Sequence, residues 1–395
     1  MSPSRDQRQR APRILNPFRY SGPLLARADI IDREGELEDM LGLAEGGHSI
    51  RLIGARRYGK TTLLTQLMAD AEQSGLATAL VDLEDVLSIG ELVVRIERAY
   101  AASLKGKPRS AVEALFNVWN VGLSLSAGGF TATLSAQPTA DTEAVLLRLL
   151  DLPRELHQRT GRHTLVIFDE VQDILAIRGA DGKLRSVIQH HGGFASYAFA
   201  GSAPGLMDQL FADPKRPLLE QAVGVELSPL PLDQVADYIE TRFRGSKRDA
   251  GTALQPVVEF TRGHPQRTML LAHYLWRRTP EHGTADEETF AAAQTDALRH
   301  AQPHLRAIFK ALTANEKRIM LALANLPGSP REQANAAAVG LNPNSASKTL
   351  EALRASANVL DVAGGRTVIT DPLFALWLRR RGLAGATADA GEDGE

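Results

Sequence analysis

Apolar positions in the first 230 residues follow two alternating spacings. Short continuous apolar runs alternate with longer segments in which leucine, valine and isoleucine recur every three or four residues. The strand-like runs are 48–53, 77–83, 163–168, 197–200 and 223–227, and the helix-like segments are 36–43, 60–74, 89–104 and 142–160. Strands that alternate with helices are typical of a parallel sheet with helices on its faces. The pattern therefore predicts an α/β core.

After residue 231 the helical spacing dominates. Four helices are predicted at 232–244, 254–261, 265–278 and 287–298, and three more at 315–324, 331–339 and 345–355. Two strand-like segments, 359–363 and 366–370, then flank Gly364 and Gly365, which indicates a hairpin. Three helices followed by a hairpin are the elements of a winged helix-turn-helix.

These changes of pattern predict five parts of the chain. They are a flexible basic leader (1–28), an α/β domain (29–230), a helical domain (231–302), a winged-helix domain (303–380) and a disordered acidic tail (381–395). A β-hairpin, with strands at 121–125 and 130–134, is expected as an insertion at about 118–136 of the α/β domain.

Composition excludes several classes of protein. Hydrophobic residues make up 44% and charged residues 23% of the 395 residues, which argues against a fibrous or disordered chain. The net charge of −2 argues against a protein that coats nucleic acid by bulk charge. Without cysteine, disulfides, thiol catalysis and cysteine-bound zinc are excluded. No apolar run of about 18 residues and no secretory signal occurs, so no membrane span is expected and a cytoplasmic location is predicted.

The strongest chemical signal is a full match to the Walker A pattern G-x-x-x-x-G-K-[ST] between a predicted strand and a predicted helix. Glycines let the backbone turn its N–H groups toward phosphate oxygens, and the helix directs its positive end to the same anion. Lysine would reach the β- and γ-phosphates of a nucleotide, and threonine would bind Mg²⁺. The candidate binding residues are Gly54, Ala55, Arg56, Arg57, Tyr58, Gly59, Lys60, Thr61 and Thr62.

A pair of carboxylates follows the apolar run 163–168. Asp169 would hold Mg²⁺ through water, and Glu170 would polarise the attacking water as general base. With Lys60 and Thr61, this pair predicts hydrolysis of a nucleoside triphosphate as well as binding.

Other polar residues have weaker signals. Ser202 follows the strand at 197–200 and is a candidate to contact the attacking water or the γ-phosphate, although it could equally be a turn residue. Arg185 and Arg216 are candidates to neutralise charge in the transition state, in cis or from a neighbouring subunit, with surface arginines as the alternative. His190 and His191 are not expected to bind a metal together, because adjacent residues on a helix face different directions.

Several motifs occur in an order that resembles a known family. The series is Asn16-Pro17-Phe18, Ile31-Asp32-Arg33-Glu34, the Walker A segment, Asp169-Glu170-Val171-Gln172, Ala200-Gly201-Ser202, Gly263-His264-Pro265 and Asp371-Pro372-Leu373-Phe374. From about residue 16 to residue 378 the chain resembles the archaeal-type ATPases, a branch of the STAND group of P-loop NTPases that also occurs in bacteria. The chain looks like a bacterial member.

This resemblance implies an AAA- or STAND-like P-loop NTPase domain, a helical lid and a C-terminal winged helix. Asp32 and Arg33 would lie near the adenine of ATP or ADP. His264 and Pro265 would belong to a glycine-x-proline element that closes over the nucleotide, although a proline there is also an ordinary helix start.

The sequence departs from the family pattern at two places. Val171 stands where an aromatic residue is often found after the acidic pair, and 219–222 lacks an arginine that many relatives carry. The second departure places a trans-acting arginine finger, and hence ring assembly, in doubt.

Three functions follow from these motifs. The favoured one is a slow Mg²⁺-dependent ATPase that acts as a nucleotide-controlled switch, monomeric with ADP and able to assemble or to engage a protein effector with ATP. The second is a DNA-binding ATPase resembling replication initiators, in which Lys348 and Arg366 of the winged helix contact duplex DNA weakly. The third is a nucleotide-binding scaffold without significant hydrolysis, against which the intact Glu170 argues.

Overall fold

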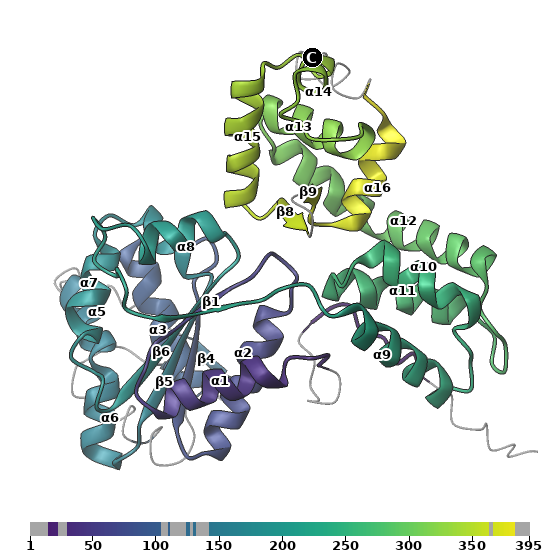
Figure 1. The fold of residues 1–395 in the computed structure, drawn as a ribbon. Coiled ribbons are helices and arrows are strands. Elements are labelled where there is room, and N and C mark those ends of the chain that lie inside the picture. Colours follow the sequence, from purple (N-terminus) through teal and green to yellow (C-terminus); the bar gives the residue numbers. More distant parts are fainter. Residues whose placement is uncertain are drawn as a thin grey trace, which may run out of the picture.

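The computed structural model describes residues 15–22, 30–103, 110, 124–126, 129–131, 142–362 and 366–383. Its centre is a five-stranded sheet in the order β2-β5-β6-β1-β7, with all neighbouring strands parallel (Figure 1). The strands are β1 (Ile50–Ile53), β2 (Ala77–Asp82), β5 (Thr164–Asp169), β6 (Ala195–Gly201) and β7 (Val223–Glu226). The predicted parallel α/β core is confirmed.

Helices cover both faces of this sheet, because alternate residues of each central strand point to opposite sides. Leu165 and Ile167 of β5 pack with α1 (Glu34–Glu45) and α2 (Lys60–Gln73). Val166 and Phe168 belong to a separate core on the other face. The helices of that face are α3 (Ile89–Ser103), α5 (Thr142–Leu150), α6 (Leu152–Thr160), the 3-10 helix η2 (Val171–Ala176), α7 (Ala180–Ile188) and α8 (Pro204–Phe211).

Some elements differ from the sequence prediction. The single helix expected at 142–160 is two helices, α5 and α6, because Pro153 has no N–H for helix hydrogen bonding and fits only a first turn. The expected hairpin is present as the antiparallel strands β3 (Ser124–Ser126) and β4 (Gly129–Thr131). The other residues predicted for its strands, 121–123 and 132–134, lie outside the described residues. Helices α7 and α8 were not predicted from the sequence.

The helical region after the sheet contains α9 (Leu232–Gly245), η3 (Gly251–Ala253), α10 (Leu254–Thr261), α11 (Pro265–Arg278) and α12 (Glu287–Ala311). The sequence predicts a helix that ends at 298 and a domain boundary at 303, but α12 continues through Pro303. Proline removes one backbone hydrogen bond from a helix. Ala301, Leu305 and Phe309 are nevertheless buried along the same stripe, so packing maintains the helix past the proline.

The C-terminal unit has the predicted order of three helices and a hairpin. These are α13 (Ala314–Asn325), α14 (Gln333–Ala338), α15 (Pro343–Ala355), β8 (Val359–Val362) and β9 (Arg366–Ile369), followed by α16 (Pro372–Arg381). Buried residues from α9 to α16 form one continuous hydrophobic core, which therefore joins the helical region to the C-terminal unit. Gly364, Gly365 and the predicted tail from residue 384 lie outside the described residues. No helix in the described ranges is long and apolar enough to cross a membrane.

The leader prediction is wrong for residues 15–22. Phe18 is only 1% exposed and packs against Phe243 and Tyr238 of α9, with ring centroids 5.6 and 6.3 Å away. The backbone carbonyl of Phe18 is 3.0 Å from Nδ1 of His273, and the Asn16 side chain donates a hydrogen bond to the His273 carbonyl. The basic character of the first 28 residues concealed this short apolar anchor.

Candidate nucleotide-binding site

The Walker A segment forms the turn from β1 to α2. Gly59 is the N-cap of α2 with φ 87°, a backbone conformation that strains side-chain-bearing residues. Gly54 lies at the end of β1, where an added Cβ would be 3.0 Å from the Leu227 Cβ. Since the first N–H groups of a helix have no intrahelical partner, this turn provides donors for an anion at the start of α2.

Lys60 is buried at the first position of α2 and bends back over the turn. Its Nζ donates hydrogen bonds to the carbonyl oxygens of Gly54 and Ala55 at 3.0 and 3.4 Å, and lies 3.9 Å from Oε1 of Glu170. Burial lowers the pKa of Lys60, while Glu170 and Asp169 act in the opposite direction. The ammonium is thus a buried cation whose carboxylate partner lies at the limit of ion-pair distance. A bound phosphate could therefore form an ion pair with it.

Thr61 and Asp169 meet at the end of β5. The Thr61 hydroxyl donates to Oδ2 of Asp169 at 3.2 Å, across 108 positions in the sequence. Burial and the neighbouring Glu170 raise the pKa of Asp169. A hydroxyl and a carboxylate are the hard oxygen ligands that Mg²⁺ prefers, so this pair fits the metal expected from the sequence.

Glu170 lies directly after β5 in the left-handed region, with φ 50° and ψ 43°. Its Oε2 accepts three hydrogen bonds: from the Ser202 backbone N–H at 3.1 Å, the Ser202 hydroxyl at 2.7 Å and the Gln172 amide at 2.7 Å. Burial alone would raise the pKa of Glu170, but Lys60 and these hydrogen bonds lower it overall. One carboxylate oxygen is therefore anchored, and the group is ionised at neutral pH.

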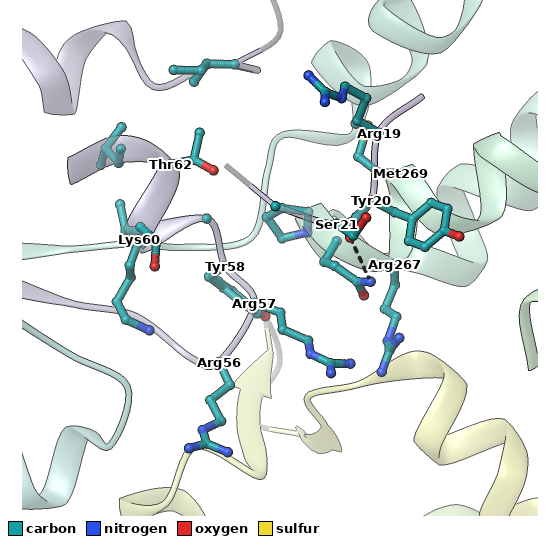
Figure 2. A pocket seen from close by; sticks show the side chains of 18 of the residues that line it. Arg19, Tyr20, Ser21, Arg56, Arg57, Tyr58, Lys60, Thr62, Arg267 and Met269 are labelled. Carbon is teal, nitrogen blue, oxygen red and sulfur yellow. Dashed lines mark hydrogen bonds between the residues drawn. The ribbon is translucent and has the colours of Figure 1, made fainter. Parts of the chain in front are cut away.

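A cavity of about 830 Å³ opens beside these residues, between the sheet and the helical region (Figure 2). One wall carries the predicted residues Arg33, Arg56, Arg57, Tyr58, Gly59, Lys60, Thr61, Thr62, Asp169 and Glu170. The opposite wall contains Pro265, Arg267 and Met269 of α11. Leu227 and Leu230, from the segment after β7, add apolar surface. A cavity with a cationic end and an apolar end suits a ligand that combines phosphate with an aromatic base.

Other predicted residues lie around the cavity without lining it. Gly54 and Ala55 accept the Lys60 hydrogen bonds, and Ser202 acts on Glu170 as described. Asp32 has φ 44° and lines a separate groove of about 630 Å³ beside α9. His264 is buried behind the Walker A turn.

Arg33 lies at the edge of the cavity and is bound to other protein groups. Its guanidinium forms an ion pair with Glu36 at 2.6 Å and a hydrogen bond with the Ser228 carbonyl. It thereby ties the start of α1 to the segment that carries Leu227 and Leu230. The resemblance alone gave no indication of this bridge.

His264 and Tyr58 connect the Walker A turn to α11. His264 is the N-cap of α11 and accepts a hydrogen bond from the Arg267 backbone, and its ring lies 5.1 Å from the Tyr58 ring, centroid to centroid. Burial lowers the pKa of His264 to about 4, and burial raises the pKa of Tyr58 to about 12. Both side chains are therefore neutral at physiological pH, and Pro265 is left facing the cavity.

The sequence analysis missed an ion pair behind the cavity. Nε of Arg267 is 2.9 Å from both carboxylate oxygens of Asp371, and its Nη2 also contacts Asp371. Asp371 additionally caps α16 by accepting from the backbone N–H groups of Leu373 and Phe374 at 2.9 and 3.2 Å. Burial and the nearby Arg267 lower the pKa of Arg57, whose side chain extends toward Arg267. One indirect indication of this ion pair was present in the sequence: the glycine-x-proline motif and the Asp371-Pro372 motif both belong to the series of family motifs.

The two candidate transition-state arginines do not line the cavity. Arg216 forms an ion pair with Asp181 of α7 at 3.0 Å, and Arg185 donates from Nε to the Pro217 carbonyl. The ring nitrogens of His191 lie 2.5 Å from the Tyr197 hydroxyl and 3.0 Å from Asp151, whereas His190 is exposed.

Searches of known proteins found similarity only at the level of structure. No family model and no curated protein matches the sequence. A Walker-type ATPase of Pyrococcus abyssi is similar with a TM-score of 0.67 and 20% identity, over 91% of this chain and 99% of that one. The ORC2 protein of Aeropyrum pernix, solved as ADPNP-ADP complexes, gives a TM-score of 0.57 and 14% identity, over 91% and 95%. At these identities the likeness concerns the fold: this chain has the fold of a P-loop NTPase, with a helical region and a C-terminal unit after the sheet.

Proposed function

We propose that this chain binds Mg²⁺-ATP in the 830 Å³ cavity, hydrolyses it slowly and uses the bound nucleotide as a switch for the position of its C-terminal regions. The observation that carries this proposal is that the Walker A turn, the acidic pair at the end of β5 and the start of α11 face one cavity. A nucleotide bound there would touch both the sheet and the helical region. Loss of one phosphate would therefore change contacts with both.

Each part of the cavity suits one part of the ligand. The N–H groups at the start of α2 and the Lys60 ammonium would bind the phosphates. Leu227, Leu230 and Met269 would enclose the base. Thr61 and Asp169 would hold Mg²⁺, which neutralises phosphate charge when bound.

Glu170 is the residue proposed to activate water. Its lowered pKa keeps it ionised, its Oε2 is fixed by Ser202 and Gln172, and the residue faces the cavity. An anchored carboxylate with a second oxygen available for water has the arrangement required of a general base. A base with a lowered pKa is weak, which agrees with slow turnover.

The test is phosphate release from ATP by wild type and by Glu170→Gln, with and without Mg²⁺. We expect Mg²⁺-dependent hydrolysis that falls by about 10²- to 10⁴-fold in the variant, the usual contribution of a general base. Equal rates in both proteins would refute the role of Glu170. A duplex DNA arm separates the alternatives: stimulation by DNA would favour an initiator-like ATPase, and indifference to DNA would favour the switch.

A further inference from the structure

Helix α8 connects the C-terminal unit to the candidate base. It begins at Pro204, two residues after Ser202, and its N-terminal turn meets the C-terminal end of α15 (Figure 1). A Cβ added to Gly205 would lie 2.5 Å from the Cβ of Ala355 and 3.0 Å from its Cα. The two helices can approach this closely because Gly205 has no side chain and Ala355 has a small one.

The other side of α8 packs against the residues that hold Glu170. A Cβ added to Gly201 would lie 2.3 Å from Sδ of Met207 and 2.6 Å from Oε1 of Gln172, so α8, β6 and η2 meet with no spare room at this point. Gln172 and Ser202 are the two residues that donate hydrogen bonds to Oε2 of Glu170. A displacement of α8 would therefore move both anchors of the carboxylate.

We propose that α15 acts as a brace for α8 and so positions Glu170 for hydrolysis. This inference rests on the proposed function and assigns a positioning role to Gly205 and Ala355, which do not touch the nucleotide cavity. With α15 docked, Ser202 and Gln172 fix the carboxylate. A ligand that pulls α15 away would slow hydrolysis and prolong the ATP-bound state.

The contact is suited to reversible docking. Two small residues meet at its closest point, and the neighbouring Leu206 remains 42% exposed. Polar contacts, by contrast, connect the C-terminal unit to the helical region: Arg267 pairs with Asp371, and Arg262 donates to the Ile369 carbonyl at 2.9 Å. Relative motion between the parts of a chain is the default expectation unless their interface is large and hydrophobic.

Gly205→Ala tests the brace with the smallest possible change. Alanine is the better helix former, so α8 itself should be stabilised and the fold retained. The added methyl collides with Ala355, and we expect kcat to fall at least about fivefold with KM changed less than twofold, because misplaced catalytic groups lose rate rather than affinity. Gly182→Ala in α7 is the matched control, since its Cβ would meet only Pro217 at 3.9 Å, and it should leave kcat unchanged.

Ala355→Gly should partly restore kcat in the Gly205→Ala background, because it removes the Ala355 Cβ, the atom nearest to the added methyl. A merely structural role predicts instead that Gly205→Ala lowers the free energy of unfolding and leaves the kcat of the folded protein unchanged. Docking can be followed in the same proteins, because the chain has no cysteine and labels at Gln209→Cys and Ala352→Cys report the α8–α15 distance. We expect a longer or broader distance distribution in Gly205→Ala and a shift back toward the wild-type distribution in the double variant.

Two results would overturn the brace while leaving the proposed function intact. One is wild-type kcat in Gly205→Ala with the helices shown to be apart. The other is a reduced kcat that Ala355→Gly does not improve. Absence of ATP hydrolysis by wild type would instead refute the proposed function itself.

Discussion

Replacing Arg267 by an uncharged side chain should destabilise the C-terminal half of the molecule strongly. Arg267 is 1% exposed, and its guanidinium contacts both oxygens of Asp371. Breaking a buried ion pair by removing one partner typically costs about 3–5 kcal/mol, because the other charge stays buried and unpaired. Asp371 keeps 16% side-chain exposure and two backbone hydrogen bonds, so we place Arg267→Met near the lower limit, at about 3 kcal/mol.

A double-mutant cycle separates the ion pair from other effects. Asp371→Asn removes the charge but retains an oxygen that can cap α16, so the Arg267→Met/Asp371→Asn protein should lose less stability than the two single losses added together. Urea unfolding followed by tryptophan fluorescence is a suitable assay, because Trp276 and Trp377 both lie in the core that contains this pair. A loss below about 1 kcal/mol in Arg267→Met, or strict additivity in the cycle, would refute the reasoning.

The Arg267–Asp371 pair should also make the stability of the fold depend on pH. Burial alone would raise the pKa of Asp371, but Arg267, its hydrogen bonds and the backbone N–H groups lower it overall. A carboxylate with a lowered pKa stabilises the fold above its unfolded pKa of about 3.9, and this contribution is lost as the pH falls through the folded value. The acid limb of the stability curve should therefore become shallower in the double variant than in wild type.

Three further changes have defined outcomes. Phe18→Ala should cost about 3–5 kcal/mol in the same urea assay, since it empties a buried aromatic site, and a loss under 1 kcal/mol would mean that residues 15–22 are not anchored. The pKa of His264 is about 4 in the folded protein and about 6.5 in the unfolded chain, so roughly 3 kcal/mol of stability should be lost as the pH falls from 6.5 to 4. His264→Asn retains a cap acceptor and should reduce this loss in unfolding curves recorded from pH 7 to pH 4. Ser202→Ala should lower kcat for phosphate release about tenfold with little change in KM, whereas Ser202→Thr should retain most of the rate. A kcat for Ser202→Ala equal to that of Ser202→Thr would show that the hydroxyl plays no part in hydrolysis.

Local patterns in the sequence were sufficient to predict the fold class and the two central motifs. The spacing of apolar residues depends on strand and helix periods, which each segment carries by itself. Lys60 and Thr61 belong to a pattern with fixed spacing, and the acidic pair at Asp169 ends a clearly apolar run. The sequence predicted that Thr61 and Asp169 would both hold Mg²⁺, and the structure brings their side chains within 3.2 Å of each other.

Features that depend on long-range packing were not predictable in the same way. Arg267 and Asp371 are separated by 104 positions, and no periodicity links them. Phe18 lies in a short segment with no helix or strand period, and the position of α9 explains its burial. Ser202 was expected near the phosphates, but its described partner is Glu170, because the turn after β6 adjoins the turn after β5.

The most direct test of the central claim is a paired measurement on Glu170→Gln and Lys60→Ala, with wild type as reference. Equilibrium titration with Mg²⁺-ATP and phosphate release are recorded on the same preparations. Glu170→Gln should bind ATP as tightly as wild type and release almost no phosphate, because it removes the base and leaves the phosphate site intact; Lys60→Ala should lose affinity. If wild type bound no ATP, or if Lys60→Ala bound it equally well, the cavity between the sheet and α11 would not be a nucleotide site.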